Sequence, residues 1–195
     1  MQTLVKNWWL LALCGILQLA MSAIYAVMQT TDGPILYHSW MGTIVLVGKL
    51  AMAAGLCAMG AALWRSRNGP IWALALNGVA LTALGFIQFA LTRFRISILT
   101  VAVLIIVMAV SMGVVELAIA RDFRRQRRFG DGWFFGLIGI VSVSLVVPSL
   151  ALGLRWVALQ PGSHLDFLWL ASYFGVAAVG MMGLAARLRR PGYWT

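Results

Sequence analysis

The stretch that decides the fold is NWWLLALCG, residues 7–15, in which two tryptophans stand at the edge of an apolar run. Trp9 is followed six positions later by Gly15, and the run continues to about residue 28. About 20 apolar residues in a helix are enough to cross a hydrocarbon core of roughly 30 Å. This length, and the lack of a following A-x-A site, favour an uncleaved membrane span over a signal peptide.

The chain as a whole has the composition of a membrane protein. Of its 195 residues, 62% are hydrophobic and 10% are charged, whereas soluble domains are about 25% charged. Six apolar stretches of suitable length follow one another, at residues 8–28, 39–64, 71–91, 96–120, 133–154 and 166–186. Because they are apolar all round, they predict helices rather than the alternating strands of a barrel. We expect an all-α membrane protein with six transmembrane helices in one integral membrane domain, residues 1–195.

The net charge of +10 is distributed unevenly between the two ends of the predicted helices. Eleven basic residues fall on one side and three on the other, so the positive-inside rule predicts that both termini lie in the cytoplasm. The larger group is Lys6, Arg65, Arg67, Arg121, Arg124, Arg125, Arg127, Arg128, Arg187, Arg189 and Arg190, and the smaller is Arg93, Arg95 and Arg155.

The strongest cluster of charge is RDFRRQRRF, residues 121–129, which contains Arg121, Arg124, Arg125, Arg127 and Arg128. Arginines at helix ends are explained by topology and by anionic lipid head groups, and no nucleic-acid partner is expected. A docking site for a protein partner or for a specific lipid is the alternative interpretation.

The opening phrase recurs. A tryptophan followed six positions later by a glycine begins the first, third and fifth stretches, as Trp9 with Gly15, Trp72 with Gly78, and Trp133 with Gly139. The intervening stretches carry glycines ahead of an apolar segment that ends in arginine, namely Gly55, Gly113 and Gly180. The pattern predicts three parallel repeats of a two-helix hairpin, at about 7–67, 69–128 and 130–190. Tryptophan favours the membrane interface, and glycine permits close helix contacts.

These hairpins resemble the HdeD-like acid-resistance membrane proteins of bacteria, and the resemblance covers nearly the whole chain. Gly85 fits a further glycine of the family repeat, whereas Ser22 and Val146 occupy the equivalent positions, and Pro148 lies inside a helix rather than near its end. The resemblance implies a six-helix inner-membrane protein associated with acid stress at high cell density. It brings no catalytic residue and no cofactor.

Several polar residues fall inside the predicted spans, where such residues are energetically unfavourable and usually face the bundle interior. Their depths suggest two layers, Lys49 with Gln88 or Gln18, and Glu116 with Asn77. A direct bridge from Lys49 to Glu116 would have to cover a depth difference of roughly 15 Å, which is too long. The alternative is that Lys49 extends outward and Glu116 extends toward the cytoplasmic boundary.

The predicted outer face gathers His38, His164 and Asp166. Imidazole has an ordinary pKa near 6.5 and is suited to sensing external acid, so these residues are pH-sensing candidates. Ordinary loop residues and a metal site are the other two interpretations, and no metal is expected. Cys14 and Cys57 are interpreted as small buried hydrophobic residues on the reducing side.

No catalytic motif is found, because H-E-x-x-H, G-x-S-x-G and C-x-x-C are all absent. The absence of these motifs favours a non-enzymatic protein, embedded in the lipid bilayer and without a cofactor. The resemblance to the HdeD-like family implies that such a protein contributes to acid or general stress resistance. A homo-oligomer or a membrane partner is left open. A small transporter or channel with a polar site around Lys49 is the alternative function.

Overall fold

The computed structural model describes residues 7–30, 37–63, 71–90, 98–125, 129–150 and 165–189. The described helices are α2 (Trp8–Thr30), α3 (Tyr37–Leu63), α4 (Ile71–Ala90), α5 (Ile98–Arg125), α6 (Phe129–Ser144) and α8 (Leu165–Leu188). Six candidate spans coincide with them, each long and apolar enough to cross a membrane. The span that begins with α6 continues to Leu150. The described part of the chain is therefore all-helical, and its six candidate spans indicate a multi-pass membrane protein, in which the backbone polar groups of each span are satisfied within its own helix.

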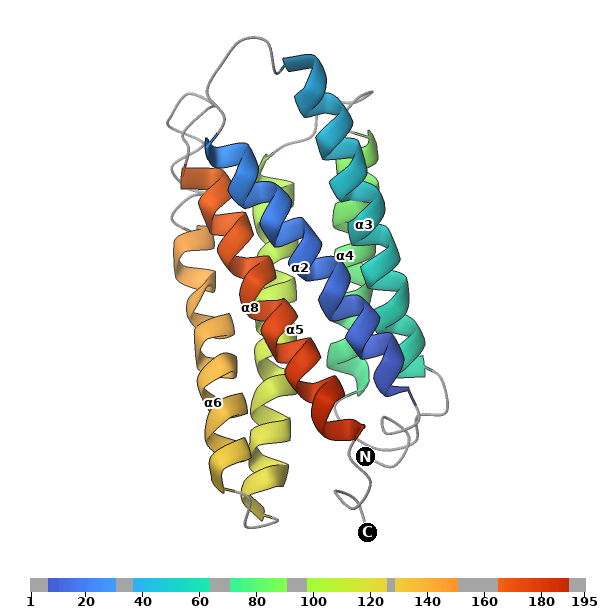
Figure 1. The fold of residues 1–195 in the computed structure, drawn as a ribbon. Coiled ribbons are helices and arrows are strands. Elements are labelled where there is room, and N and C mark those ends of the chain that lie inside the picture. The colour runs from blue at the N-terminus through green and yellow to red at the C-terminus, as the bar shows by residue number, and fades with distance from the viewer. Residues whose placement is uncertain are drawn as a thin grey trace.

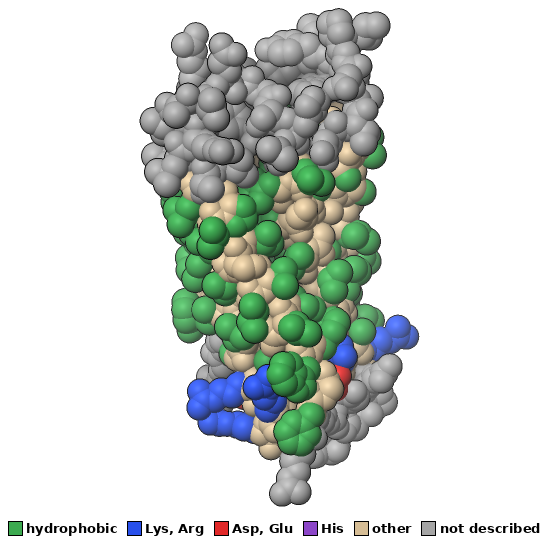
Figure 2. All heavy atoms as spheres, turned by 90° about the vertical axis from the view of Figure 1, so that its left-hand side faces the viewer, with side chains coloured by type: hydrophobic (Ala, Val, Ile, Leu, Met, Phe, Trp, Pro, Cys, Tyr) green, Lys and Arg blue, Asp and Glu red, His purple; other side chains and the backbone are tan. Residues whose placement is uncertain are grey.

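Successive helices run in opposite directions (Figure 1). The first residues of α2, α4 and α6 lie at the same end of the bundle as the last residues of α3, α5 and α8. The described arginines at this end lie in the last turns of α5 and α8 or, for Arg189, directly after α8; they are Arg121, Arg124, Arg125, Arg187 and Arg189. Figure 2 shows basic side chains gathered there, below a broad apolar band.

Three pairs of helices make the most extensive contacts, α3 with α4, α2 with α8, and α5 with α6. Contacts between α2 and α3 and between α4 and α5 are less extensive, and α6 meets α8 over a small area. The six helices thus close into a ring, in which α8 returns to the first helix. Within this ring, the closest packing joins one predicted hairpin to the next rather than the two helices of a single hairpin.

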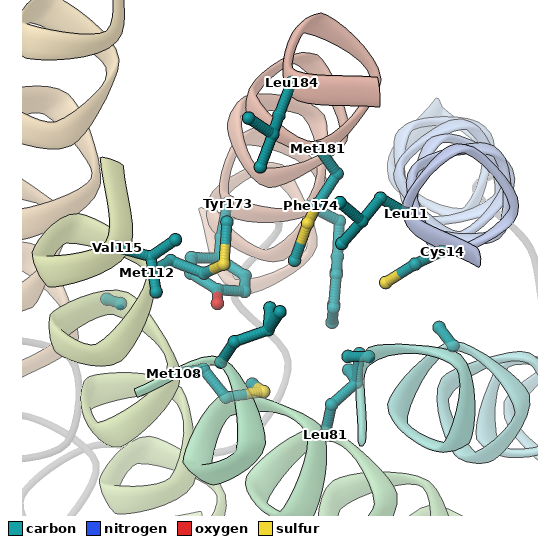
Figure 3. Packing of buried hydrophobic residues seen from close by; sticks show 14 of the residues in the cluster. Leu11, Cys14, Leu81, Met108, Met112, Val115, Tyr173, Phe174, Met181 and Leu184 are labelled. Carbon is teal, nitrogen blue, oxygen red and sulfur yellow. The ribbon is translucent and has the colours of Figure 1, made fainter. Parts of the chain in front are cut away.

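Helix α2 shows how one face turns inward. Its buried side chains recur with the spacing of three and four residues that places them on one stripe of a helix, as at Leu11, Cys14, Gln18, Met21 and Tyr25. Figure 3 shows the resulting core from close by, where side chains of α2, α4, α5 and α8 converge. Methionines and aromatic rings provide several of its largest side chains, beside many alanines and leucines, and the flexible methionines suit an interior with an irregular shape.

The contact between α3 and α4 is made by glycines. A Cβ added at Gly55 would lie 2.6 Å from the carbonyl oxygen of Gly78, and one added at Gly48 would lie 2.8 Å from that of Gly85. Each pair is separated from the other by seven residues on both helices, so the two contacts lie two turns apart along one seam. Without side chains, the two backbones come close enough for continuous van der Waals contact, which holds helices together in lipid.

The other two close pairs use larger residues. In α2 and α8, a Cβ at Gly15 would lie 2.7 Å from Cγ of Met182, and the Ser22 hydroxyl donates a hydrogen bond of 2.6 Å to the carbonyl of Ala171. In α5 and α6, a Cβ at Gly139 would lie 3.0 Å from Cγ of Leu117. Backbone approach is therefore tightest along the seam between α3 and α4.

Candidate functional site

A buried carboxyl lies where α5, α6 and α8 meet. Glu116 of α5 is only 2% exposed, and its Oε2 accepts a hydrogen bond of 2.7 Å from the hydroxyl of Ser142 on α6. Its other oxygen, Oε1, lies against Gly180 of α8, so closely that a Cβ there would overlap it. Gly180 thus provides the space that the carboxyl occupies, and any larger residue at this position would displace it.

The chemistry of this site is that of a polar link in an apolar interior. Within the described part of the chain, Glu116 forms no ion pair, and Oε1 has no hydrogen-bond partner. A buried polar group is stabilised only by the hydrogen bonds that it makes, so the Ser142 hydroxyl is the contact on which the placement of Glu116 depends. The sequence predicted an interior position for Glu116 but did not single out Ser142.

A second polar link joins α4 to α2. The amide nitrogen Nε2 of Gln88 donates a hydrogen bond of 2.6 Å to the hydroxyl of Tyr25, and both side chains are buried. The ring of Tyr25 stacks on Phe174 of α8, with centroids 5.8 Å apart and an angle of 9° between planes. Tyr25 lies seven residues after Gln18 on the buried stripe of α2, and this spacing is the sequence signal that could have identified it.

Two further amides are enclosed without such a link. Asn77 is fully buried, and among the described residues neither atom of its amide group has a hydrogen-bond partner. Gln18 is 1% exposed, and its Oε1 is similarly unpaired within the described helices. An unsatisfied buried amide is unfavourable by about 1–3 kcal/mol. Each of these two side chains therefore either lowers the stability of the bundle or has a function that offsets this loss.

The predicted polar layers are not formed. Lys49 is exposed on the outside of the bundle, whereas its expected partner Gln88 is buried against Tyr25. Glu116 bonds to Ser142 instead of Asn77. The outward position of Lys49 agrees with the alternative interpretation, but Glu116 does not, because it points into the bundle. Depth along the helix was a poor guide here, since direction around the axis changes by about 100° with each residue.

The glycines predicted to make helix contacts face either the backbone of a neighbouring helix or, at one position, a buried carboxyl. Gly55 and Gly78 face each other, as do Gly113 and Gly139, since a Cβ on Gly113 would lie 3.2 Å from the Gly139 carbonyl oxygen. Gly180 differs, because it faces the carboxyl of Glu116. Gly15 instead faces α8 near Ala178, whose carbonyl oxygen would lie 3.2 Å from its Cβ.

The tryptophans Trp9, Trp72 and Trp133 are all exposed and lie within the first turns of α2, α4 and α6. At this end of the bundle the guanidinium of Arg124 lies 4.9 Å from the centre of the Trp133 ring, and that of Arg189 lies 5.4 Å from the Trp8 ring. Such stacking is favourable by about 0.5–1 kcal/mol at an exposed site. Trp133, and Trp8 beside Trp9, therefore position arginines at this end of the bundle.

An ion pair crosses from α8 to α6 at the same end. Nε of Arg187 donates a hydrogen bond of 2.6 Å to Oδ1 of Asp131, and the guanidinium lies over the rings of Phe134 and Phe135, 4.8 Å and 5.3 Å from their centres. Asp131 is in the first turn of α6, where a negative charge is favourable to the helix dipole. The pair fixes the end of α8 against the start of α6.

Several predicted residues fall outside the described part of the chain. The side chains of His38, His164 and Asp166 are among them, as are Arg127 and Arg128, so pH sensing by the histidines stays a prediction. Among the described residues, no three His, Cys, Asp or Glu side chains come together as a group that could hold a metal ion. Cys14 is buried, Cys57 is partly exposed, and both are free thiols.

We compared the chain with protein-family models, with curated proteins and with solved structures, and none of them matches it.

Proposed function

We propose that the chain is a non-enzymatic inner-membrane protein of the HdeD-like type, which supports the resistance of a bacterium to acid or general stress. The observation that carries this proposal is the filled interior of the bundle. Met108, Met112 and Met181 are at most 1% exposed, and the aromatic rings of Tyr173 and Phe174 close the space between them (Figure 3). An interior packed in this way favours a structural or partner-binding role over the passage of a solute.

The alternative of a transporter or channel required a polar site around Lys49 inside the bundle. Lys49 is exposed on the outer surface of α3, where a long side chain can extend its charge toward the head groups. Four of the described polar side chains that face inward form two separate links, Glu116 with Ser142 and Gln88 with Tyr25, and the buried amides of Gln18 and Asn77 belong to neither link. This separation does not favour a continuous polar path.

We also propose that the six helices derive from three parallel hairpin repeats with both termini in the cytoplasm. Support comes from the three close helix pairs, in each of which a glycine of the outgoing helix meets a larger residue of the returning helix. These contacts are Gly78 with Met59, Gly15 with Met182, and Gly139 with Leu117. The described basic residues near helix ends lie at the end where α2 begins and α8 finishes, as the positive-inside rule requires of a cytoplasmic side.

The test of function is acid survival. We expect that deleting the gene from its host lowers survival after an acid shift, most clearly at high cell density, and that the wild-type chain restores it. A Gly55→Leu variant should fail to restore survival, because it separates α3 from α4. The matched control is Gly42→Ala in the same helix, where a Cβ would meet nothing within 4 Å. Unchanged survival of the deletion strain would refute the proposal.

A second measurement separates the two functional classes. The purified chain is placed in liposomes that contain a pH-sensitive dye, and the rate of proton entry is compared with that of protein-free liposomes. We expect equal rates. A faster rate that Lys49→Met abolishes would replace the proposed function with the transporter alternative.

A further inference from the structure

A groove of about 580 Å³ runs along the outside of the bundle between α5 and α6, at the end where α5 finishes. On the α5 side it is lined by Arg121, Arg124 and Arg125, with Leu117 and Ala120 deeper along the helix. The spacing of these residues, three or four apart, places them on one face of α5. We call this feature the α5–α6 groove. Its α5 wall is basic at one end and apolar at the other.

The α6 wall is apolar along its length. Trp133, Leu137 and Ile140 line it, and Gly136 forms part of its floor. From Trp133 to Ile140 the wall rises about 10 Å along the helix axis. Trp133, Leu137 and Ile140 are all well exposed. The groove therefore extends from the charged end of the bundle into the apolar band that Figure 2 shows above it.

Arg124 is held over the groove by its neighbours. Its aliphatic stem packs on Gly132, where a Cβ would lie 2.7 Å from Cγ of Arg124, and its guanidinium stacks on Trp133. One nitrogen of that guanidinium, Nη2, would lie 3.7 Å from a Cβ at Gly136. The charge is thus positioned at the floor before any ligand arrives, and this reduces the entropy that binding must overcome.

The charge of the groove is not balanced by its own lining. None of the described residues that line it is acidic, although Asp122 is adjacent in the chain to Arg121. Asp131, in the first turn of α6, forms an ion pair with Arg187 of α8. Three arginines therefore face an opening whose other walls are apolar, and the complementary ligand has an anionic head and an apolar tail.

We propose that the α5–α6 groove binds one anionic phospholipid. Its phosphate group accepts hydrogen bonds from Arg121, Arg124 and Arg125, since guanidinium groups form charge-assisted pairs with phosphate. One acyl chain lies against Leu137 and Ile140, over the floor at Gly136. The orientation agrees with that of a lipid in the surrounding leaflet, because the arginines lie at the helix end and the apolar wall lies deeper. This site goes beyond the proposed function and does not depend on it.

The apolar wall is the reason for choosing a lipid over a soluble anion. A free phosphate would use the arginines but leave the surface from Trp133 to Ile140 uncovered. A second copy of the chain would cover that surface but would bring its own arginines. Like charges would then face each other, which is unfavourable. An anionic lipid satisfies both halves of the groove at once.

The experiment is native mass spectrometry of the full chain in a neutral detergent, with dioleoyl phosphatidylglycerol or dioleoyl phosphatidylcholine added. We expect one phosphatidylglycerol to remain bound, at a concentration at which phosphatidylcholine does not. A basic residue near an anionic membrane surface strengthens binding by about fivefold. The double variant R121Q/R124Q should therefore bind phosphatidylglycerol about 25-fold more weakly.

Two further variants identify the groove itself. Gly136→Leu keeps every charge but fills the floor, where a Cβ would make ordinary contacts at 3.7 Å and 3.9 Å, so it should also lose the lipid. The control is Arg189→Gln, which removes one charge at the same end of the bundle but not from the groove. It should bind as the wild type does.

Three results would overturn the proposal. The first is a loss of about fivefold in Arg189→Gln, the same loss per charge as in R121Q/R124Q, which would indicate general attraction to the basic end. The second is displacement of the lipid by inorganic phosphate at a similar concentration, which would indicate a soluble anion. The third is a dimer that Gly136→Leu dissociates, which would assign the groove to a second copy. If R121Q/R124Q does not fold, Gly136→Leu alone decides between these outcomes.

Discussion

Replacing Gly55 by alanine should weaken the bundle, although the same change in an open helix would strengthen it. A Cβ at Gly55 would lie 2.6 Å from the carbonyl oxygen of Gly78 and 2.6 Å from the backbone nitrogen of Thr82, and it would overlap the Thr82 hydroxyl. That hydroxyl donates a hydrogen bond of 2.8 Å to the Gly78 carbonyl, so it cannot turn away without losing its partner. Since two of the three obstacles are backbone atoms, α3 and α4 must separate.

The size of the effect follows from that separation. Ordinary contact begins near 3.4 Å, so a distance of 2.6 Å requires a local displacement of roughly 0.8 Å. A gap of about 0.5–1 Å removes a quarter to a half of each neighbouring van der Waals contact, and overpacking is typically unfavourable by about 1–3 kcal/mol. Alanine recovers up to about 1 kcal/mol through its higher helix propensity. We expect a net loss of about 1–2 kcal/mol in the free energy of unfolding.

The assay is reversible unfolding in mixed micelles of a mild detergent and sodium dodecyl sulfate, followed by tryptophan fluorescence and circular dichroism. Gly42→Ala is the matched control in the same helix, because nothing lies within 4 Å of its Cβ. It should leave stability unchanged or raise it by up to about 1 kcal/mol.

A double variant sharpens the test. Once Gly55→Ala has moved the helices apart, Gly78→Ala should fit into the gap already opened, since both changes disturb one contact. The combined loss should therefore be smaller than the sum of the single losses by at least about 0.5 kcal/mol. If Gly55→Ala proves as stable as Gly42→Ala, or if the two losses simply add, the close approach of α3 and α4 is not what stabilises this seam.

Three other substitutions test the buried polar groups by the same unfolding measurement. Ser142→Ala should lower the unfolding free energy by about 1–3 kcal/mol, because it removes the donor to a buried carboxyl, and the loss should shrink markedly in a Glu116→Leu background. Asn77→Leu should raise stability by about 1–3 kcal/mol, since it removes an amide without partners among the described residues. No gain would indicate that this amide is satisfied. Tyr25→Phe should lower stability by about 1–3 kcal/mol, and adding Gln88→Leu should recover most of that loss. A double-mutant cycle with zero coupling would contradict the observed hydrogen bond.

The spans themselves could be predicted from sequence because they depend on length and apolarity alone. The stretch at 8–28 corresponds to α2, Trp8–Thr30, and that at 71–91 corresponds to α4, Ile71–Ala90. The fifth helix begins at Phe129, earlier than the predicted residue 133, because Asp131 is favourable in its first turn and pairs with Arg187. Charged residues thus lengthen a helix that an apolar pattern alone would start later.

Neighbours across the bundle could not be predicted in the same way. In lipid, apolarity does not distinguish the face of a helix that meets another helix from the face that meets acyl chains. Depth in the membrane predicts that Lys49 and Gln88 are neighbours, yet Lys49 faces outward and Gln88 donates a hydrogen bond to Tyr25. The glycines were better guides, because a missing side chain is useful mainly where another backbone approaches.

The pair α5 and α6 differs from the other two pairs in a way that bears on function. In the seam of α3 and α4, backbone atoms lie within 2.8 Å of a Cβ placed at Gly55 or Gly78, whereas the atoms nearest to Gly113 and Gly139 belong to the side chains of Val143 and Leu117. Side chains of this size hold the two backbones less closely than a glycine seam does. The same pair carries the link from Glu116 to Ser142 on its inner side and the α5–α6 groove on its outer side. A ligand in that groove would contact Leu117, the residue after Glu116 in α5. We therefore expect that Glu116→Leu, which alters packing on the inner side, also changes the affinity of the groove for its ligand, and an unchanged affinity would show that the two sides of α5 are independent.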